Sequence, residues 1–352
     1  MVTKIVVVGA GLIGRKHIEV VRQEAILDGI IDPSDAAKIY AADLEVPWFP
    51  SIENYLDVSR ADGAIIATPN QLHLQNATAF IEAGVPILVE KPLADNAGNA
   101  AEIVELATLR NVPVLVGHHR RHSPLVKAAK AAIASGRLGR IVSVHAQFWL
   151  LKPDDYFDLN WRKQLGAGPT YINLIHDIDL LRYFCGEIVS VQAKESQAIR
   201  EFEVEDTSAV ILEFQNGALG TVSISDTIAA PWSWELTAGE NPVYPKTNMA
   251  CYMVGGTKGS LSIPDMRLWA HPGKQSWWEP IKSKKLSFQP ADPIKEQLLH
   301  FIDVISNGVA PLVSGLEGLI NLSVLDAIKK AARFSNNASV EINQPNLNLG
   351  RK

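Results

Sequence analysis

Three polar side chains at helical spacing form a reactive cluster in this sequence. Asn173, His176 and Asp179 are three residues apart within the apolar stretch 169–184, so a helix would place them on one face. A buried polar stripe requires hydrogen-bonding partners or a cleft. Histidine exchanges a proton near neutral pH, and a neighbouring carboxylate raises its basicity. The stretch predicts an acid–base site, with a structural core histidine as the alternative.

The first 32 residues predict a dinucleotide site. An apolar run, 4–8, leads into Gly9-Ala10-Gly11-Leu12-Ile13-Gly14, a helical segment and a second apolar run that ends in Asp32. The glycines allow a tight turn, the approach of a pyrophosphate and close helix packing, and the helix N-terminus attracts phosphate. Asp32 would bind ribose hydroxyls and repel a 2′-phosphate, which favours NAD over NADP. A glycine turn that only joins two packed elements is the alternative.

The motif Thr68-Pro69-Asn70-x-x-His73 follows the next predicted strand, 61–67. It ends that strand and opens a helix predicted over 71–83, at the sheet edge where ligands bind in this architecture. We expect Asn70 to cap the helix and Thr68 to offer its hydroxyl. A capped helix start without any binding role is the alternative.

Glu90-Lys91-Pro92 ends the following strand, 85–89, at the same edge. Pro92 keeps Lys91 out of helical geometry. The Lys91 side chain is long enough to reach a nicotinamide or a substrate hydroxyl, and we expect Glu90 to orient its ammonium group. A solvated lysine after a strand is the alternative.

A basic cluster, Gly117-His118-His119-Arg120-Arg121-His122, follows the predicted strand 112–116. Histidine beside arginine suits hydroxyl or carboxylate groups of a substrate. Salt bridges between domains are the alternative. Metal binding is not expected, because no compact carboxylate or cysteine partner accompanies the histidines.

The composition favours a protein with two cored domains that acts on small molecules. The chain has 352 residues, of which 47% are hydrophobic, and a net charge of −5, which predicts neither nucleic acid nor an anionic membrane as a partner. Only two cysteines occur, so a reducing, cytoplasmic location is expected. The start of the sequence does not resemble a signal peptide, and no apolar run approaches the ~18 residues of a membrane span.

The order of predicted elements indicates an α/β protein with two domains. Alternating strands and helices predict a Rossmann-type, doubly wound parallel sheet over residues 1–120. After residue 120 this regular alternation of strands and helices ends. Residues 121–342 predict an α+β domain with a large, mostly antiparallel open sheet. A tail is expected over 343–352. One face of the second sheet would lack helices, so self-association into a homodimer or homotetramer is expected.

Several ordered landmarks along nearly the whole chain resemble the glucose–fructose oxidoreductase / inositol dehydrogenase (Gfo/Idh/MocA) family of NAD(P)-dependent oxidoreductases. They include the glycine turn, the Thr68 and Lys91 motifs, Trp161-Arg162 before a glycine-rich turn, and the helix with His176 and Asp179. The resemblance implies that Lys91 and His176 are catalytic and that Arg120 and Asp179 contact substrate. It also implies sugars, polyols and related cyclic alcohols as substrates.

One departure from the family pattern affects the proton relay. Many members carry an aspartate four residues before the histidine, and Ile172 occupies that position here. Asn173 is the nearest polar replacement, but it is turned ~100° around a helix and cannot take up a proton. We therefore expect Lys91 and His176 to share the acid–base work, with Asn173 only positioning the substrate or the histidine.

These observations predict an NAD-dependent dehydrogenase that acts on a secondary alcohol of a sugar, polyol or cyclic diol. An NAD-using glycoside hydrolase of similar fold and a catalytically inactive sugar-sensing regulator are the alternatives. The residues predicted to bind substrate are His119, Arg120, Trp161, Arg162, Asn173 and Asp179. The residues predicted to bind the cofactor are Gly9, Gly11, Leu12, Ile13, Gly14, Asp32, Thr68, Pro69, Asn70, His73, Glu90 and Lys91.

Overall fold

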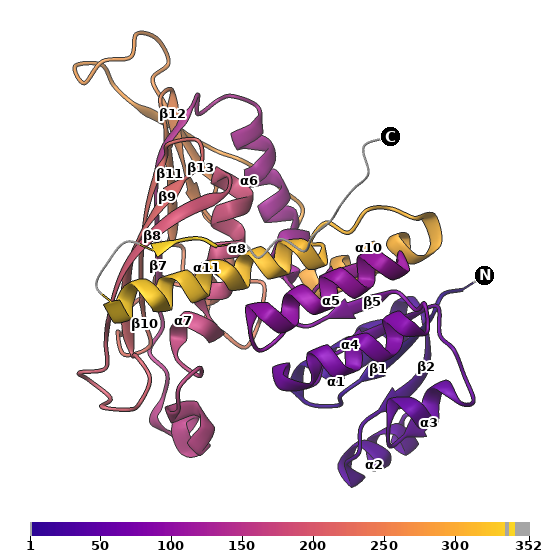
Figure 1. Cartoon of the computed structure of the whole chain (residues 1–352). Helices are drawn as coiled ribbons and strands as arrows, with labels where there is room; N and C mark the ends of the chain where they lie inside the picture. Colours follow the sequence, from indigo (N-terminus) through magenta and orange to yellow (C-terminus); the bar gives the residue numbers. More distant parts are fainter. Residues whose placement is uncertain (1, 335–337, 342–352) are drawn as a thin grey trace. The chain divides into compact units, whose positions relative to one another are not determined.

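A computed structural model describes residues 2–334 and 338–341, and the predicted tail 343–352 lies outside them. Figure 1 shows the course of the chain. The described residues form two compact units. The first holds residues 2–122 and 292–322, and the second holds 123–291 and the described residues from 323 onward.

The first unit contains a six-stranded, wholly parallel sheet. Its strands lie in the order β3-β2-β1-β4-β5-β6, in which the direction of strand addition reverses between β1 and β4. The strands are buried on both sides, which explains why their sequences are apolar without alternation. Their bounds are β1 Lys4–Val8, β2 Ile26–Ile31, β3 Trp48–Phe49, β4 Gly63–Ile66, β5 Ile87–Val89 and β6 Val114–Val116.

Helices alternate with these strands. Helix α1 packs against α10, and α4 packs against α5. The arrangement is the doubly wound order in which ligands bind at the carboxyl edge, beside the reversal between β1 and β4. The bounds are α1 Leu12–Glu24, α2 Asp35–Asp43, α3 Ile52–Leu56, η1 Asn70–Leu72, α4 His73–Glu82, α5 Ala97–Arg110, η2 His119–His122 and α10 Pro293–Asn307.

The predicted domain boundary was wrong for residues 292–322, which were assigned to the second domain but belong to the first unit. A Cβ on Gly63 of β4 would come within 2.5 Å of Ile305 in α10, so this helix packs directly on the sheet. Helix α11 (Gly315–Phe334) begins against β6, because Gly318 is packed on Val116. Local sequence periodicity does not reveal which sheet such helices cover.

The second unit contains a nine-stranded sheet in the order β14-β13-β12-β11-β7-β10-β9-β8-β15. All neighbouring strands are antiparallel except β7 and β10, which are parallel. The bounds are β7 Ile141–Trp149, β8 Ile188–Ser196, β9 Thr207–Phe214, β10 Leu219–Ser225, β11 Tyr252–Gly256, β12 Gly259–Ile263, β13 Arg267–Ala270, β14 Lys282–Lys285 and β15 Ala338–Ser339. The predicted fold class is confirmed in both units.

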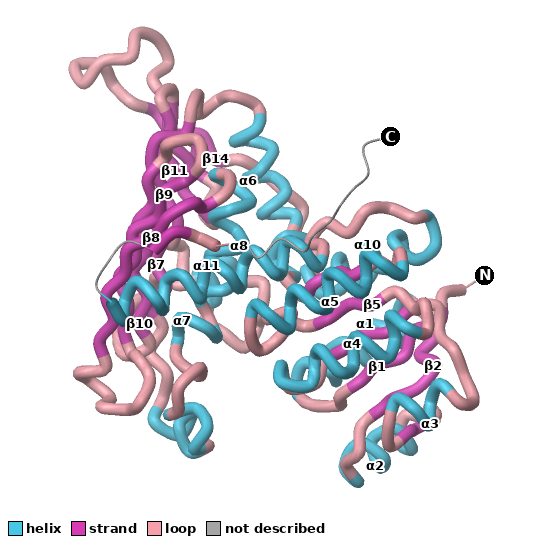
Figure 2. Tube along the Cα trace, in the orientation of Figure 1, coloured by secondary structure: helices cyan, strands magenta, loops and turns pink. Residues whose placement is uncertain are grey.

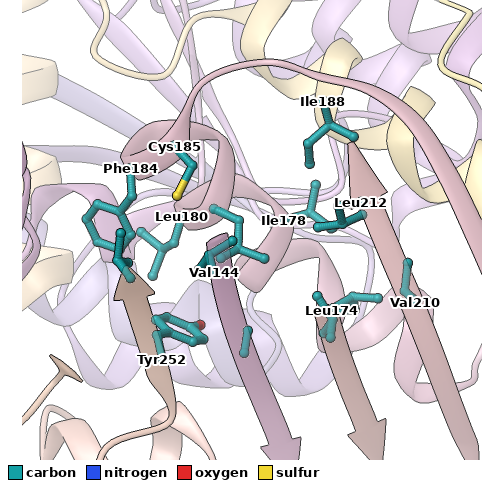
Figure 3. Close-up of a cluster of buried hydrophobic side chains, with 14 of the residues drawn as sticks. Val144, Leu174, Ile178, Leu180, Phe184, Cys185, Ile188, Val210, Leu212 and Tyr252 are labelled. Carbon is teal, nitrogen blue, oxygen red and sulfur yellow. The ribbon is translucent and has the colours of Figure 1, made fainter. Parts of the chain in front are cut away.

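Helices pack on one face of this sheet, where α6 and α8 lie together in Figure 2. Figure 3 shows part of the core between α8 and the sheet, where Leu174 and Ile178 of α8 lie beside Val210 and Leu212 of β9. The other helices of this unit are short. The bounds are α6 Pro124–Ala134, η3 Asp154–Asp158, η4 Asn160–Lys163, α7 Pro169–Ile172, α8 Leu174–Cys185 and α9 Trp234–Ala238.

Two predicted helices differ from the structure at their starts. The stretch 169–184, predicted as one helix, is broken at Asn173. This residue lies between α7 and α8 and has a φ of −109° and a ψ of −50°. The helix predicted over 71–83 begins as the tight turn η1 before α4 starts at His73.

Candidate functional site

The glycine turn of the first unit is shaped as the motif predicts. Gly9 has a φ of +92°, which a residue with a side chain rarely adopts. A Cβ on Gly14 would lie 2.0 Å from the carbonyl oxygen of Gly9, so the third glycine permits the close approach of α1 to β1. A Cβ on Gly11 would meet no atom within 4 Å, so the second glycine faces open space. That space lies at the N-terminus of α1, where unpaired N–H groups favour a phosphate.

Asp32 lies at the end of β2 and is held by backbone groups. Its Oδ2 accepts the N–H of Ala10 at 2.8 Å, and its Oδ1 accepts the N–H and the hydroxyl of Ser34 at 2.9 and 2.6 Å. Partial burial opposes the charge, but the hydrogen bonds from Ser34 and Ala10 keep the pKa of Asp32 below its usual value. A carboxylate oxygen accepts about two hydrogen bonds, so Oδ2 retains capacity for a ribose hydroxyl.

A cleft of about 540 Å³ brings several predicted cofactor residues together. Gly9, Gly11 and Asp32 line it with Thr68 and Pro69. The sequence analysis missed the opposite wall, which comes from the start of α3 and from α4. The missed residues are Pro50, Ser51, Ile52, Glu53, Leu72, Gln75, Asn76 and Ala79. Gly11 leaves open space at the N-terminus of α1, and Asp32 offers a carboxylate acceptor, which are features that the pyrophosphate and ribose of a dinucleotide require.

Leu12 and Ile13 stand at the start of α1, and Leu12 is 95% exposed beside the open space at Gly11.

Asn70 starts η1 and makes no helix-capping hydrogen bond, so the expected cap at α4 was wrong. The hydroxyl of Thr68 instead accepts a hydrogen bond from Asn76 at 3.0 Å. The preceding turn η1 supplies the first backbone contacts, which makes a side-chain cap unnecessary.

His73 links two turns at the carboxyl edge of the sheet. Its Nε2 lies 2.9 Å from the carbonyl oxygen of Thr68, and its Nδ1 lies 2.8 Å from that of Pro92. The ring is 1% exposed, and burial lowers the pKa of His73 despite these carbonyl contacts. His73 therefore supports the Thr68 turn, which lines the cleft, and the turn that contains Lys91.

Glu90 is buried and its carboxylate is held by groups on two sides. Oε1 lies 2.8 Å from Nε2 of His17, and Oε2 accepts the backbone N–H of Lys91 at 3.2 Å. Burial would raise the pKa of Glu90, but the hydrogen bond and charge of His17, helped by His119 and Lys91, hold it at about 2. The expectation that Glu90 orients the Lys91 ammonium overlooked His17, which lies on the buried side of α1 three residues after Gly14.

The basic cluster after β6 forms the turn η2 and is mostly buried. Arg120 is 3% exposed, and Arg121 donates to Glu317 of α11 at 2.9 Å, an ion pair inside the first unit. Burial lowers the pKa of His119 to about 4, with Glu90 opposing and Arg120 adding to the shift. His119 is therefore neutral near pH 7.

In the second unit, His176 and Asp179 lie on α8 and are 8% and 1% exposed. Asn173 stands at the break before α8, and the N–H of His176 donates to its carbonyl oxygen at 3.1 Å. The side-chain Oδ1 of Asn173 is shielded from solvent and accepts no hydrogen bond from the residues that the structure describes. Because the helix is broken, the three polar residues predicted to share one helix face do not all lie on one helix. His176 and Asp179 lie on α8, and Asn173 precedes it.

Trp161 and Arg162 lie in the turn η4. Trp161 is 53% exposed, and the Arg162 guanidinium lies 4.1 Å from the Tyr156 ring centroid and donates to the Tyr156 carbonyl oxygen at 2.6 Å. Trp234, in contrast, is 3% exposed and stacks on Tyr252, so it belongs to the core.

Residues 2–334 and 338–341 contain no cluster of three or more histidine, cysteine or acidic side chains arranged for a metal ion. No helix in the same residues has the length and apolar character needed to cross a membrane.

A doubly wound sheet with this glycine turn, the acid at the end of β2 and an appended α+β unit defines a class of nicotinamide-nucleotide-dependent oxidoreductases. Family models place the chain more narrowly. Residues 3–118 match the oxidoreductase family with an NAD-binding Rossmann fold, and residues 126–262 match the GFO/IDH/MocA C-terminal domain. The chain belongs to the Gfo/Idh/MocA family.

Similar proteins agree with this assignment. The inositol 2-dehydrogenase of Corynebacterium glutamicum is 30% identical over 63% of this chain, and the match spans 66% of that enzyme. The levoglucosan dehydrogenase of Pseudarthrobacter phenanthrenivorans is 28% identical over 65% of this chain and 61% of its own length. The fold matches the WlbA dehydrogenase of Bordetella pertussis, crystallised with NADH and UDP-GlcNAcA, with a TM-score of 0.78 and 24% identity over 97% of this chain and 100% of that one.

Proposed function

We propose that this protein is an NAD-dependent dehydrogenase that oxidises a secondary alcohol of a sugar, polyol or cyclic diol, or reduces the corresponding ketone. The family and the cleft support the cofactor. The names of the similar proteins, an inositol dehydrogenase and a levoglucosan dehydrogenase, support a carbohydrate-like alcohol. When bound, NAD accepts or donates hydride at its nicotinamide ring.

The observation that carries this proposal is the location of Lys91 in the first unit. His73 connects the Lys91–Pro92 turn to the Thr68 turn, and Thr68 lines the dinucleotide cleft. Lys91 therefore stands at the carboxyl edge of the sheet, next to the cleft, where an amine can contact an alcohol oxygen.

We assign the transfer of the substrate's hydroxyl proton to Lys91 and His176. The imidazole of His176 is suited to accept a proton near neutral pH, and the amine of Lys91 is suited to hydrogen-bond an alcohol oxygen. Asn173 then positions the substrate, because its amide cannot take a proton and its shielded Oδ1 has the capacity to accept a hydroxyl hydrogen bond. His119, Arg120, Trp161, Arg162 and Asp179 complete the proposed set of substrate contacts.

The experiment is a panel of polyols, aldoses and cyclic diols, assayed for NADH formation by absorbance. A productive substrate is then tested with Lys91→Ala and His176→Gln, each expected to lower kcat by about 100-fold or more while NAD still binds. Lys285→Ala, which removes an exposed lysine on β14, is the matched control and should retain full activity.

Three outcomes would contradict the proposal. Near-normal turnover in Lys91→Ala would remove the assigned role of this lysine. Cleavage of a glycoside without net NADH would indicate a hydrolase. Binding of NAD and sugar with no turnover across the panel would indicate a sensor.

We also propose that the open face of the second sheet joins copies of the chain into a dimer or tetramer. Ile211, Leu219 and Met253 project from that face and are 47%, 54% and 41% exposed. A shallow groove of about 400 Å³ lies on the same face, between His145 and Gln192. Apolar side chains at the centre of an exposed sheet favour burial against a second protein surface.

Light scattering tests the proposed assembly. Ile211→Lys should lower the measured mass toward one chain, whereas Leu109→Lys, at a 79% exposed position on α5, should leave it unchanged. A wild-type chain that is monomeric at micromolar concentration would contradict the proposal.

A further inference from the structure

His17 and Glu90 form a buried pair between the nucleotide-binding helix and the lysine motif. His17 lies on α1, the helix whose N-terminus follows the glycine turn, and is 1% exposed. Its Nε2 lies 2.8 Å from Oε1 of Glu90, which is 7% exposed and immediately precedes Lys91. The two side chains therefore connect the two segments of the first unit to which cofactor binding and acid–base chemistry are assigned.

The packing around Glu90 leaves its carboxylate little freedom. A Cβ on Gly117 would come within 2.9 Å of the Glu90 Cα and 3.0 Å of its Oε2, so the chain after β6 lies directly against it. Oε2 accepts the backbone N–H of Lys91 at 3.2 Å. The other ionisable groups that interact with this carboxylate are Lys91, His119 and His73.

We propose that His17 is a positioning residue for Lys91: it holds Glu90 as a fixed anion, which in turn fixes the Lys91 backbone and provides a negative charge beside the Lys91 amine. This inference rests on the proposed role of Lys91 and extends it to a residue outside both motifs. A buried carboxylate without a donor on Oε1 would take up a proton or move, and either change would release the Lys91 turn.

The consequence of losing His17 is a new dependence of the rate on acidity. With His17 present, the hydrogen bond and the charge of the imidazole keep Glu90 ionised far below neutral pH, since they hold its pKa at about 2. Without that donor, burial favours the protonated carboxyl and raises the pKa of Glu90. The value of kcat would then fall on the acidic side of that pKa, because a protonated Glu90 no longer anchors Lys91.

The experiment compares His17→Leu with His17→Gln. Leucine fills space without a donor, whereas glutamine carries an amide N–H near the position of Nε2. Tyr55→Phe is the matched control, because it removes a 2.7 Å hydrogen bond to the carboxylate of Asp28 elsewhere in the first unit. For each variant we measure the dissociation constant for NAD, the pH profile of kcat and the melting temperature.

We expect His17→Leu to lower kcat by about tenfold or more at mildly acidic pH while changing NAD affinity by less than about threefold. His17→Gln should restore most of the rate, and the double variant His17→Leu/Glu90→Gln should lack the new acidic limb. If His17→Leu and Tyr55→Phe lower the melting temperature equally and both keep the wild-type pH profile, the pair is only a structural contact and the inference is overturned.

Failure of the proposed function is distinguishable from failure of this inference. The melting temperatures of His17→Leu and His17→Leu/Glu90→Gln as a function of pH report the ionisation of Glu90 without requiring turnover, because both variants lack the imidazole. If the two pH dependences differ while Lys91→Ala remains active, Glu90 is held as described but Lys91 is not catalytic. If they do not differ, His17 does not control the ionisation of Glu90.

Discussion

The Nζ of Lys329 lies 2.7 Å from Oε2 of Glu205. Lys329 is on α11, and it also contacts both oxygens of Glu195 at 2.8 and 2.9 Å. The other oxygen of Glu205 accepts the N–H of Thr170, at the start of α7, at 3.0 Å. A lysine near the end of the chain thus fixes the short helix that precedes Asn173 and His176.

Removal of Lys329 is expected to destabilise the second unit. Glu205 is 6% exposed, so Lys329→Met would leave a buried carboxylate without its cation and lower the free energy of unfolding by about 3 kcal/mol. Lys330→Met is the control, because Lys330 pairs with Glu341 only at 3.8 Å on the surface and should cost less than about 1 kcal/mol. Denaturant titration measures both, and equal effects would contradict the prediction.

Substitutions at two glycines of the turn should affect stability and NAD binding separately. Gly14→Ala places a methyl group 2.0 Å from the Gly9 carbonyl oxygen, so we expect a loss of about 3 kcal/mol or more in unfolding free energy. Gly11→Ala meets no protein atom, so its melting temperature should stay near wild type while NAD affinity falls by about tenfold or more. Calorimetry on both variants checks this, and tight NAD binding by Gly11→Ala would place the pyrophosphate elsewhere.

Asp32 is expected to set the choice between NAD and NADP. A second carboxylate, Glu53, lines the same cleft, and a hydrogen bond from Ser51 keeps its pKa low. Asp32→Ala should weaken NAD and strengthen NADP, shifting the affinity ratio by about tenfold or more toward NADP. Asp35→Ala, a change at the next acid along the chain, should leave the ratio unchanged. Isothermal titration calorimetry with NAD and NADP measures both affinities. An unaltered ratio of these affinities in Asp32→Ala would refute the role assigned to Asp32.

His119 should make the protein less stable as the pH falls. Burial lowers its pKa from 6.5 to about 4, so between these values the unfolded chain binds a proton that the folded chain does not. The free energy of unfolding therefore decreases as the pH drops from about 6.5 to about 4. His119→Gln should reduce this slope and leave a constant difference from wild type near pH 8. An unchanged slope in urea titrations would show that His119 binds its proton equally well in both states.

Sequence patterns predicted most elements of the fold because the strands are apolar and the helices amphipathic. The small edge elements were missed, since β3 has only two residues, and β14 is composed of exposed polar residues that carry no apolar period. The broken helix at Asn173 was also missed, because the residues on both sides of the break keep helical spacing in the sequence.

The candidate site was predicted in part. The cleft collects Gly9, Gly11, Asp32, Thr68 and Pro69 as expected, because all follow strands at one edge of a parallel sheet. Asn70 does not cap α4 as expected, and nothing in the sequence indicated the two carbonyl oxygens near the His73 ring, since a residue type fixes only what a side chain can donate or accept. Their actual partners were chosen by the turn in which they lie.

The sequence by itself determined the family, the cofactor fold and the reactive residue types, because glycine spacing and local periodicity are properties of neighbouring residues. Only the tertiary structure decided that His17 contacts Glu90, that Lys329 holds the start of α7, and that residues 292–322 complete the first unit. Each of these depends on a contact between segments far apart in the chain. Such contacts form to satisfy a buried charge or to cover an apolar face, and no short-range pattern encodes which distant residue will do so.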